Sequence, residues 1–124
     1  MRSDCSPERW LATAAEGMPC PGSVAARKAF ARAVLVVFLL TQATDGVLTY
    51  IGVGMHGMHA EANPLAARLM AAVGLGPAVA GLKLATASIG CGLHVLGVHR
   101  VLAVVAAIYV VAAVLPWAAV LLAW

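Results

Sequence analysis

Charged side chains are scarce in this chain. Only 10% of its 124 residues are charged, whereas 63% are hydrophobic. A soluble domain is about half apolar and a quarter charged, and a chain of this length could not hide so much apolar surface in a water-exposed fold. The composition therefore excludes an ordinary soluble domain. It leaves room for about three membrane-spanning helices of about 20 residues each.

Cysteine is also rare, with three residues at Cys5, Cys20 and Cys91. Their spacing matches no common metal site, and a reducing cytoplasmic compartment and an apolar span do not favour disulfides. The chain has no dense basic run with interleaved aromatic residues, so we expect no nucleic-acid partner. No cofactor is predicted within the chain.

The N-terminal region lacks the apolar run of a cleaved signal peptide. The first such run begins only near Ala33, after several acidic residues, and a signal peptide would start its apolar core much earlier. Residues 1–26 are therefore predicted to form a tail. Within it, Ser6, Pro7 and Glu8 are typical of the start of a helix, here a short amphipathic one.

Three apolar stretches predict membrane-spanning helices in the remainder of the chain. The fold class is therefore all-α, an integral membrane three-helix bundle. The transmembrane domain is expected to cover residues 27–124, with spans at about residues 33–54, 77–98 and 101–124.

A shorter helix is predicted between the first two spans, at about residues 64–73. Asn63 is a good N-cap and Pro64 suits the first helical position. About 10 residues give a length of only about 15 Å, which is too short to cross a bilayer. This helix is therefore either interfacial or re-entrant.

Basic residues are distributed unevenly along the chain, and Lys and Arg concentrate on the cytoplasmic side of short loops. The N-terminus is therefore predicted in the cytoplasm of a bacterium. The C-terminus, with Trp117 and Trp124 suited to the outer interface, is predicted on the periplasmic side of the inner membrane. The basic residues that indicate this are Arg2, Arg9, Arg27, Lys28 and Arg32, before the first span, and Arg100, between the last two.

Asp45 and Lys83 are the most informative residues, because each places a charge inside a predicted span. A charge near the bilayer centre costs about 2.5–3.5 kcal/mol or more, so such residues find partners. Asp45 lies about 12 Å and Lys83 about 9 Å from the outer ends of their helices. Matching depth predicts an ion pair. It is either a latch that fixes helix register, a proton, ion or substrate site, or a contact with a partner subunit.

Other polar and small residues have a pattern of their own. Thr49 shares a helix face with Asp45. In the second span, small residues recur at alternating spacings of three and four, which lets membrane helices approach closely. These predicted helix-packing residues are Ala78, Gly81, Ala85, Ser88 and Gly92.

The loop after the first span contains His56, His59 and Glu61, which are zinc-type ligand residues. Their spacing is not that of a helical metalloprotease motif, and the segment contains glycine. We therefore predict no metal site, and keep these three residues only as weak candidates.

Several of these residues together resemble a family of small prokaryotic membrane proteins, the domain of unknown function 5658. The shared pattern is an Asp with a Thr four residues later, a Glu-x-Asn-Pro element and a Lys in the following helix. The resemblance implies that Glu61 and Asn63 act with Asp45 and Lys83. We expect Glu61 to dip towards Lys83 while Asn63 caps the short helix. The matching residues are Asp45, Thr49, Glu61, Asn63, Pro64 and Lys83.

Three functional hypotheses follow. The first is an accessory or structural subunit of a larger membrane complex of respiratory or photosynthetic type. The alternative is an oligomeric carrier of a small solute, ion or proton, which uses the intramembrane Asp/Glu/Lys cluster. A lipid-modifying membrane enzyme ranks last, because the sequence offers no convincing nucleophile or metal cluster, and we expect no enzyme. The expected partners are membrane lipids and other membrane subunits or copies of the same chain.

Overall fold

The computed structural model describes residues 21–123, and every regular element among them is helical. The chain divides into two compact units, residues 1–33 and residues 34–124. The short helix predicted around Ser6, Pro7 and Glu8 lies outside the described residues. All residues of the predicted polar cluster belong to the second unit.

The first long helix, α2 (Pro21–His56), begins earlier than the apolar pattern predicts. Residues 23–32 are rich in Ala, Arg and Lys, which are good helix formers, and Pro21 suits a first helical position. The helix therefore continues through the predicted boundary between tail and transmembrane domain at residue 26. Hydropathy locates an apolar span but not a helical extension beyond it.

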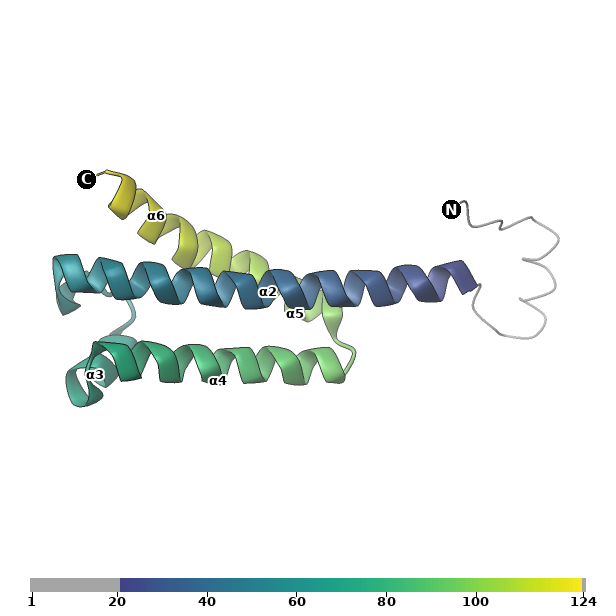
Figure 1. The fold of residues 1–124 in the computed structure, drawn as a ribbon, viewed down its shortest axis with the longest axis horizontal. Helices are drawn as coiled ribbons and strands as arrows, with labels where there is room; N and C mark the ends of the chain where they lie inside the picture. Colours follow the sequence, from purple (N-terminus) through teal and green to yellow (C-terminus); the bar gives the residue numbers. More distant parts are fainter. Residues whose placement is uncertain (1–20, 124) are drawn as a thin grey trace. The chain divides into compact units, whose positions relative to one another are not determined.

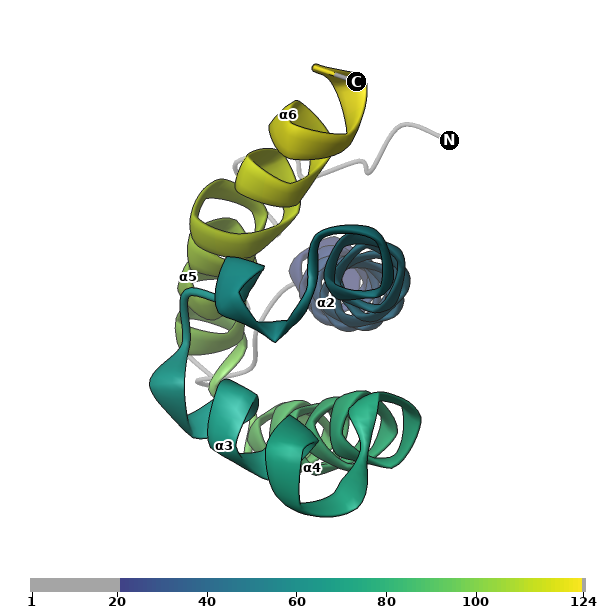
Figure 2. The ribbon, with the colours of Figure 1, turned by 90° about the vertical axis from the view of Figure 1, so that its left-hand side faces the viewer.

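A single-turn 3-10 helix, η1 (Met58–Ala60), and the short helix α3 (Pro64–Val73) follow. The bounds of α3 are those predicted from Asn63 and Pro64. Gly74, with a φ of 91°, joins α3 to α4 (Leu75–Val95), and this left-handed conformation favours glycine. Ala66 and Met70 are the buried residues of α3, which lies next to the start of α4 (Figures 1 and 2).

The last helical run consists of α5 (His99–Tyr109), a π-helical segment (Val110–Val114) and α6 (Leu115–Leu122). Pro116 has no N–H to donate to the carbonyl of Ala112, four residues earlier, and its ring crowds that carbonyl. A wider π turn just before the proline relieves this conflict. The N–H of Leu115 accordingly donates to the carbonyl of Val110, five residues back.

Three of these helices are long and apolar enough to cross a membrane: residues 23–56, 75–95 and 99–122. In the second unit, the teal part of α2 lies between α4 on one side and the α5–α6 run on the other (Figure 2). The buried apolar residues form two separate clusters. One contains Val53, Ala66, Met70, Ala78 and Val79, and the other Val34, Phe38, Leu102 and Ala106.

The predicted helix-packing stripe of α4 is not used for packing within the described chain, except at Ala78, which is fully buried. Gly81, Ala85, Ser88 and Gly92 are exposed. No described atom lies within 4 Å of a Cβ added at Gly81 or Gly92. The neighbouring helices contact α4 on another face, which contains Val79, Lys83 and Gly90.

Candidate functional site

Asp45 of α2 and Lys83 of α4 form an ion pair between Lys83 Nζ and Asp45 Oδ2. Their matching depths predicted this pair. The side chain of Asp45 is 5% exposed and that of Lys83 23% exposed. A Cβ on Gly46 would lie 3.2 Å from Lys83 Cγ, so the glycine next to Asp45 leaves room for the lysine stem against α2.

Two further groups contact the ion pair. The hydroxyl of Thr49, one turn along α2, donates to Asp45 Oδ1 at 3.3 Å. The ammonium of Lys83 lies 5.3 Å from the centre of the Tyr109 ring, within range of a cation–π interaction. Both carboxylate oxygens of Asp45 therefore accept hydrogen bonds, and Lys83 contacts an anion and an aromatic face.

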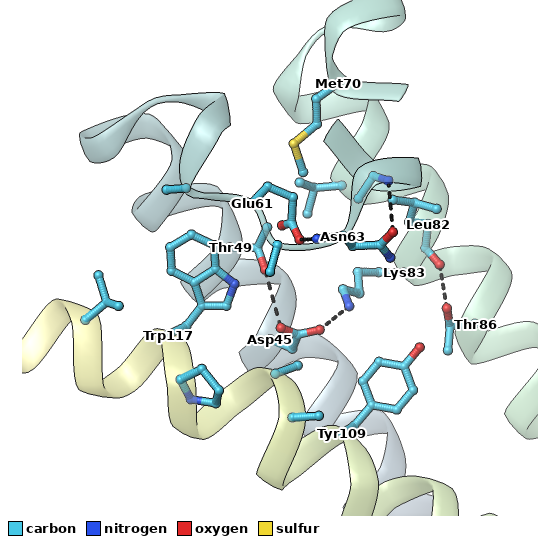
Figure 3. A pocket seen from close by; sticks show the side chains of 18 of the residues that line it. Asp45, Thr49, Glu61, Asn63, Met70, Leu82, Lys83, Thr86, Tyr109 and Trp117 are labelled. Atoms are coloured by element: carbon cyan, nitrogen blue, oxygen red, sulfur yellow. Dashed lines mark hydrogen bonds and ion pairs between the residues drawn. The ribbon is translucent and has the colours of Figure 1, made fainter. Parts of the chain in front are cut away.

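A cavity of about 380 Å³ opens beside the pair. Its polar wall is formed by α2 and α4, and its other wall comes from the π-helical segment and α6 (Figure 3). The cavity is therefore amphipathic. The polar wall includes Asp45, Thr49, Lys83 and Thr86, and the opposite wall includes Ala112, Ala113, Pro116 and Trp117.

The loop between η1 and α3 contributes the third charged group of the cavity lining. Asn63 caps α3 as predicted, because its side-chain oxygen accepts from the N–H of Leu65 at 3.0 Å and of Ala66 at 3.5 Å. Glu61 Oε1 accepts from the N–H of Asn63 at 2.8 Å. This places the carboxylate in the cavity lining, with Asp45 and Lys83 below it in Figure 3.

The structure differs from the sequence-based expectation that Glu61 approaches Lys83. Among the described residues, the hydrogen bonds and ion pairs of these two side chains are Glu61 with the N–H of Asn63, and Lys83 with Asp45. A carboxylate reaches an N–H two residues away with little loss of chain entropy. Glu61 and Lys83 therefore share the cavity without forming a direct ion pair.

The three weak metal candidates do not gather into one group among the described residues. Nδ1 of His56 lies 3.0 Å from the carbonyl of Gly52, so this nitrogen donates, and the ring lines the cavity together with Glu61. His59 lies on η1 and is exposed. Within residues 21–123, no three His, Cys, Asp or Glu side chains gather in a group that could hold a metal ion.

The aromatic residues of the site were not predicted from the sequence. Trp117 was expected at the outer membrane interface. In the structure its ring rests on Gly52, where an added Cβ would lie 2.1 Å from Trp117 Cζ3. Tyr109 contacts Lys83 and ends α5 at the start of the π-helical segment. Gly52 on the polar face of α2 and the helix-disturbing Pro116 were the available signals for these contacts.

Comparison with known proteins identifies the family. The family model described as "domain of unknown function (DUF5658)" matches residues 36–123. This range covers more than half of the chain and includes every residue of the polar cluster, so the chain belongs to this family. Neither a curated protein nor a solved structure matches the chain.

Proposed function

We propose that this member of the DUF5658 family is an integral membrane protein that binds and carries a small ion or polar solute in the cavity beside Asp45 and Lys83. The observation that carries the proposal is the placement of a nearly buried ion pair on the wall of a cavity of about 380 Å³. Ionisable groups inside a membrane are costly and commonly mark ion and substrate pathways.

The unequal exposure of the two side chains supports a mechanism in which Asp45 exchanges its partner. Asp45 is fixed by Thr49 and almost inaccessible, whereas Lys83 keeps about a quarter of its side chain exposed. A proton or small cation that binds Asp45 would replace the ammonium as its partner. Lys83 would then move into the cavity, towards Glu61 and the ring of Tyr109. In this mechanism Lys83 is an internal cation that a transported cation or proton displaces.

A carrier of this size requires more than one copy. Three long helices rarely enclose a polar path by themselves, and closed symmetric oligomers are the usual solution. We therefore propose that the carrier works as an oligomer. The orientation with a cytoplasmic N-terminus in a bacterial inner membrane, predicted from the basic residues, forms part of the same proposal.

A second candidate function, an accessory subunit of a larger membrane complex, is favoured by a different observation. The exposed small residues of α4, Gly81 and Gly92 above all, leave a face against which a partner helix can approach closely. On this hypothesis the Asp45–Lys83 pair is an assembly latch rather than a transport site.

Proton and cation flux into proteoliposomes tests the carrier. The proteoliposomes contain a pH-sensitive dye, and a Na⁺, K⁺ or methylammonium gradient is imposed across their membrane. The flux that the dye reports should be larger with the wild-type protein than in protein-free liposomes. The Asp45→Asn/Lys83→Gln double variant, which leaves no unpaired charge, should lose at least about tenfold in flux. Ser88→Ala on the exposed face of α4 is the matched control and should retain it. Wild-type flux equal to that of empty liposomes would contradict the carriage of protons and cations at Asp45.

Gentle extraction from native membranes separates the two candidates. An accessory subunit predicts a stoichiometric larger partner, lost on Gly81→Leu because the added side chain fills the open face. A carrier predicts a homo-oligomer. Because the space at Gly81 is open within the described chain, this variant should fold, and a partner that is retained by it would argue against the α4 face as the contact.

A further inference from the structure

Gln42 is an unusual buried residue. It is the only glutamine of the chain and is 2% exposed. Neither Nε2 nor Oε1 of its amide has a hydrogen-bond partner among the described residues. Leaving two buried polar atoms unpaired costs free energy, and native proteins almost always satisfy such groups with protein or ordered water. A group from outside the described side chains is therefore needed at this position.

The position of Gln42 places it just past the ion pair. It precedes Asp45 by three residues and Thr49 by seven, so all three share one face of α2. On α4, Lys83 pairs with Asp45, and the ring of Phe38 rests on Gly90. The level midway between these two contacts is that of Gln42 on α2 and Thr86 on α4.

Two residues at this level already belong to the cavity. Thr86 lines it. Tyr109 also lines it, and its ring lies both 5.3 Å from Lys83 Nζ and 6.4 Å from the ring of Phe38. Gln42 itself is not among the residues that line the cavity, but on α2 it lies between Asp45 and Phe38, at the level at which the cavity reaches Thr86 and Tyr109.

An apolar seal lies beyond Gln42, on the side away from the cavity. Phe38 is 1% exposed and Leu102 is fully buried. A Cβ at Gly90 would lie only 2.1 Å from the Phe38 ring. This seal, formed by Val34, Phe38, Leu102 and Ala106, offers no hydrogen-bonding side chain. The partner of the Gln42 amide must therefore arrive from the cavity.

We propose that the ligand site extends past the Asp45–Lys83 pair and that Gln42 is its innermost binding residue. A primary amide both donates and accepts, so its complement is an O–H group, which does the same. The source of that group is either water that hydrates a carried ion or a hydroxyl of a carried solute. The role in carriage rests on the proposed function, whereas the contact with an O–H group does not.

Selective labelling tests the contact directly. Protein labelled with ¹⁵N in the glutamine side-chain amide gives one side-chain ¹⁵N resonance in detergent micelles, seen as one pair of N–H signals, because the chain has one glutamine. We expect cross-peaks between this signal and water, and a shift or a loss of those cross-peaks when glycerol is added as a hydroxyl probe. Cross-peaks that glycerol leaves unchanged assign the site to water alone. An amide without water cross-peaks, and insensitive to glycerol, would overturn the proposal.

Gln42→Leu provides a second measurement, because it replaces the amide with an apolar side chain that still fills most of the space. If the amide is bound, the variant loses that interaction and its Tm falls or stays unchanged. A rise in Tm of more than about 3 °C would show that the amide is an unsatisfied liability and would overturn the proposal. Thr41→Val is the control, since the buried Thr41 hydroxyl already donates to the carbonyl of Val37 at 2.8 Å.

The two proposals fail in different ways. Water contact at Gln42 without flux in proteoliposomes would remove the carrier function and leave the binding position. Flux without water contact at Gln42 would support the carrier function but would make Asp45, not Gln42, the innermost residue of the site. With both present, Gln42→Leu should lower the flux by about tenfold, while Thr41→Val should leave it unchanged.

Discussion

The second unit packs its two halves in different ways. The filled half is closed by the seal of Val34, Phe38, Leu102 and Ala106. The hollow half begins at Asp45 and continues to the loop of Glu61, and its buried cluster of Val53, Ala66, Met70, Ala78 and Val79 borders a cavity of about 380 Å³. The same helices α2 and α4 thus make an apolar contact at one level and a polar contact beside a cavity at the next.

A pair of glycine–aromatic contacts shows the difference most directly. In the filled half the Phe38 ring rests on Gly90, and in the hollow half the Trp117 ring rests on Gly52. A Cβ would lie 2.1 Å from the ring in both places. Phe38 is 1% exposed, however, whereas Trp117 is partly exposed and borders the cavity. The Trp117 ring in the hollow half therefore has space to move aside when a Cβ is added, whereas the Phe38 ring in the filled half does not.

The largest expected effect comes from breaking the ion pair at the edge of the hollow half. Asp45→Asn should lower the free energy of unfolding by about 2–3 kcal/mol, because it leaves Lys83 without its counter-ion. The partial exposure of Lys83 to the cavity keeps this below the value for a fully buried charge. Thermal unfolding in detergent measures it. Asp45→Asn combined with Lys83→Gln should lose less than Asp45→Asn alone, and additive losses would count against the pair.

The next largest effect tests the filled half. Gly90→Ala should destabilise the protein by about 1–3 kcal/mol, because its Cβ overlaps the Phe38 ring, which is 1% exposed. Gly92→Ala, two residues further along the same helix, has nothing within 4 Å of its Cβ in the described chain. It should change stability by no more than about 0.5 kcal/mol. Equal effects of the two substitutions would mean that the Phe38 ring does not pack against Gly90.

The corresponding change in the hollow half sharpens the comparison. Gly52→Ala should cost less than Gly90→Ala, about 1 kcal/mol, because the Trp117 ring can move into the cavity. The same movement should shift the tryptophan fluorescence, an effect absent from Gly54→Ala, whose Cβ meets no described atom within 4 Å. A loss as large as that of Gly90→Ala, with unchanged fluorescence, would indicate that the cavity wall is as rigid as the seal.

Much of this arrangement could be predicted from the sequence where a local rule applies. The lengths of the apolar stretches predicted the long helices that follow Asp45. The residue types at positions 63 and 64 predicted the start of α3. The matching depths of Asp45 and Lys83 in their helices predicted the ion pair between them. These features depend on spacing along one helix or on the cost of an isolated charge. The start of α2 at Pro21 was missed because polar helix formers leave no hydropathy signal.

The contacts that the sequence did not predict depend on how the helices are rotated against one another. Small residues on α4 indicated a packing face, yet the structure places Gly81 and Gly92 outside and Gly90 against Phe38. A stripe of small residues shows where a neighbour can approach, not which neighbour it is. The position of Tyr109 over Lys83 likewise depends on the rotation of α5 relative to α4, which no spacing along either helix determines.

The smallest expected effect tests the loop that contributes Glu61 and Asn63 to the lining of the hollow half. Asn63→Ala removes the side-chain oxygen that accepts from Leu65 and Ala66, and it should cost about 0.5–1 kcal/mol. Asn63→Asp keeps an accepting oxygen at the same position and should retain most of the stability. Because the N–H of residue 63 also holds Glu61, a loosened cap should release this carboxylate from the cavity lining. Carrier flux should then fall in Asn63→Ala more than in Asn63→Asp. Equal flux in both would show that the cap of α3 does not contribute to the site.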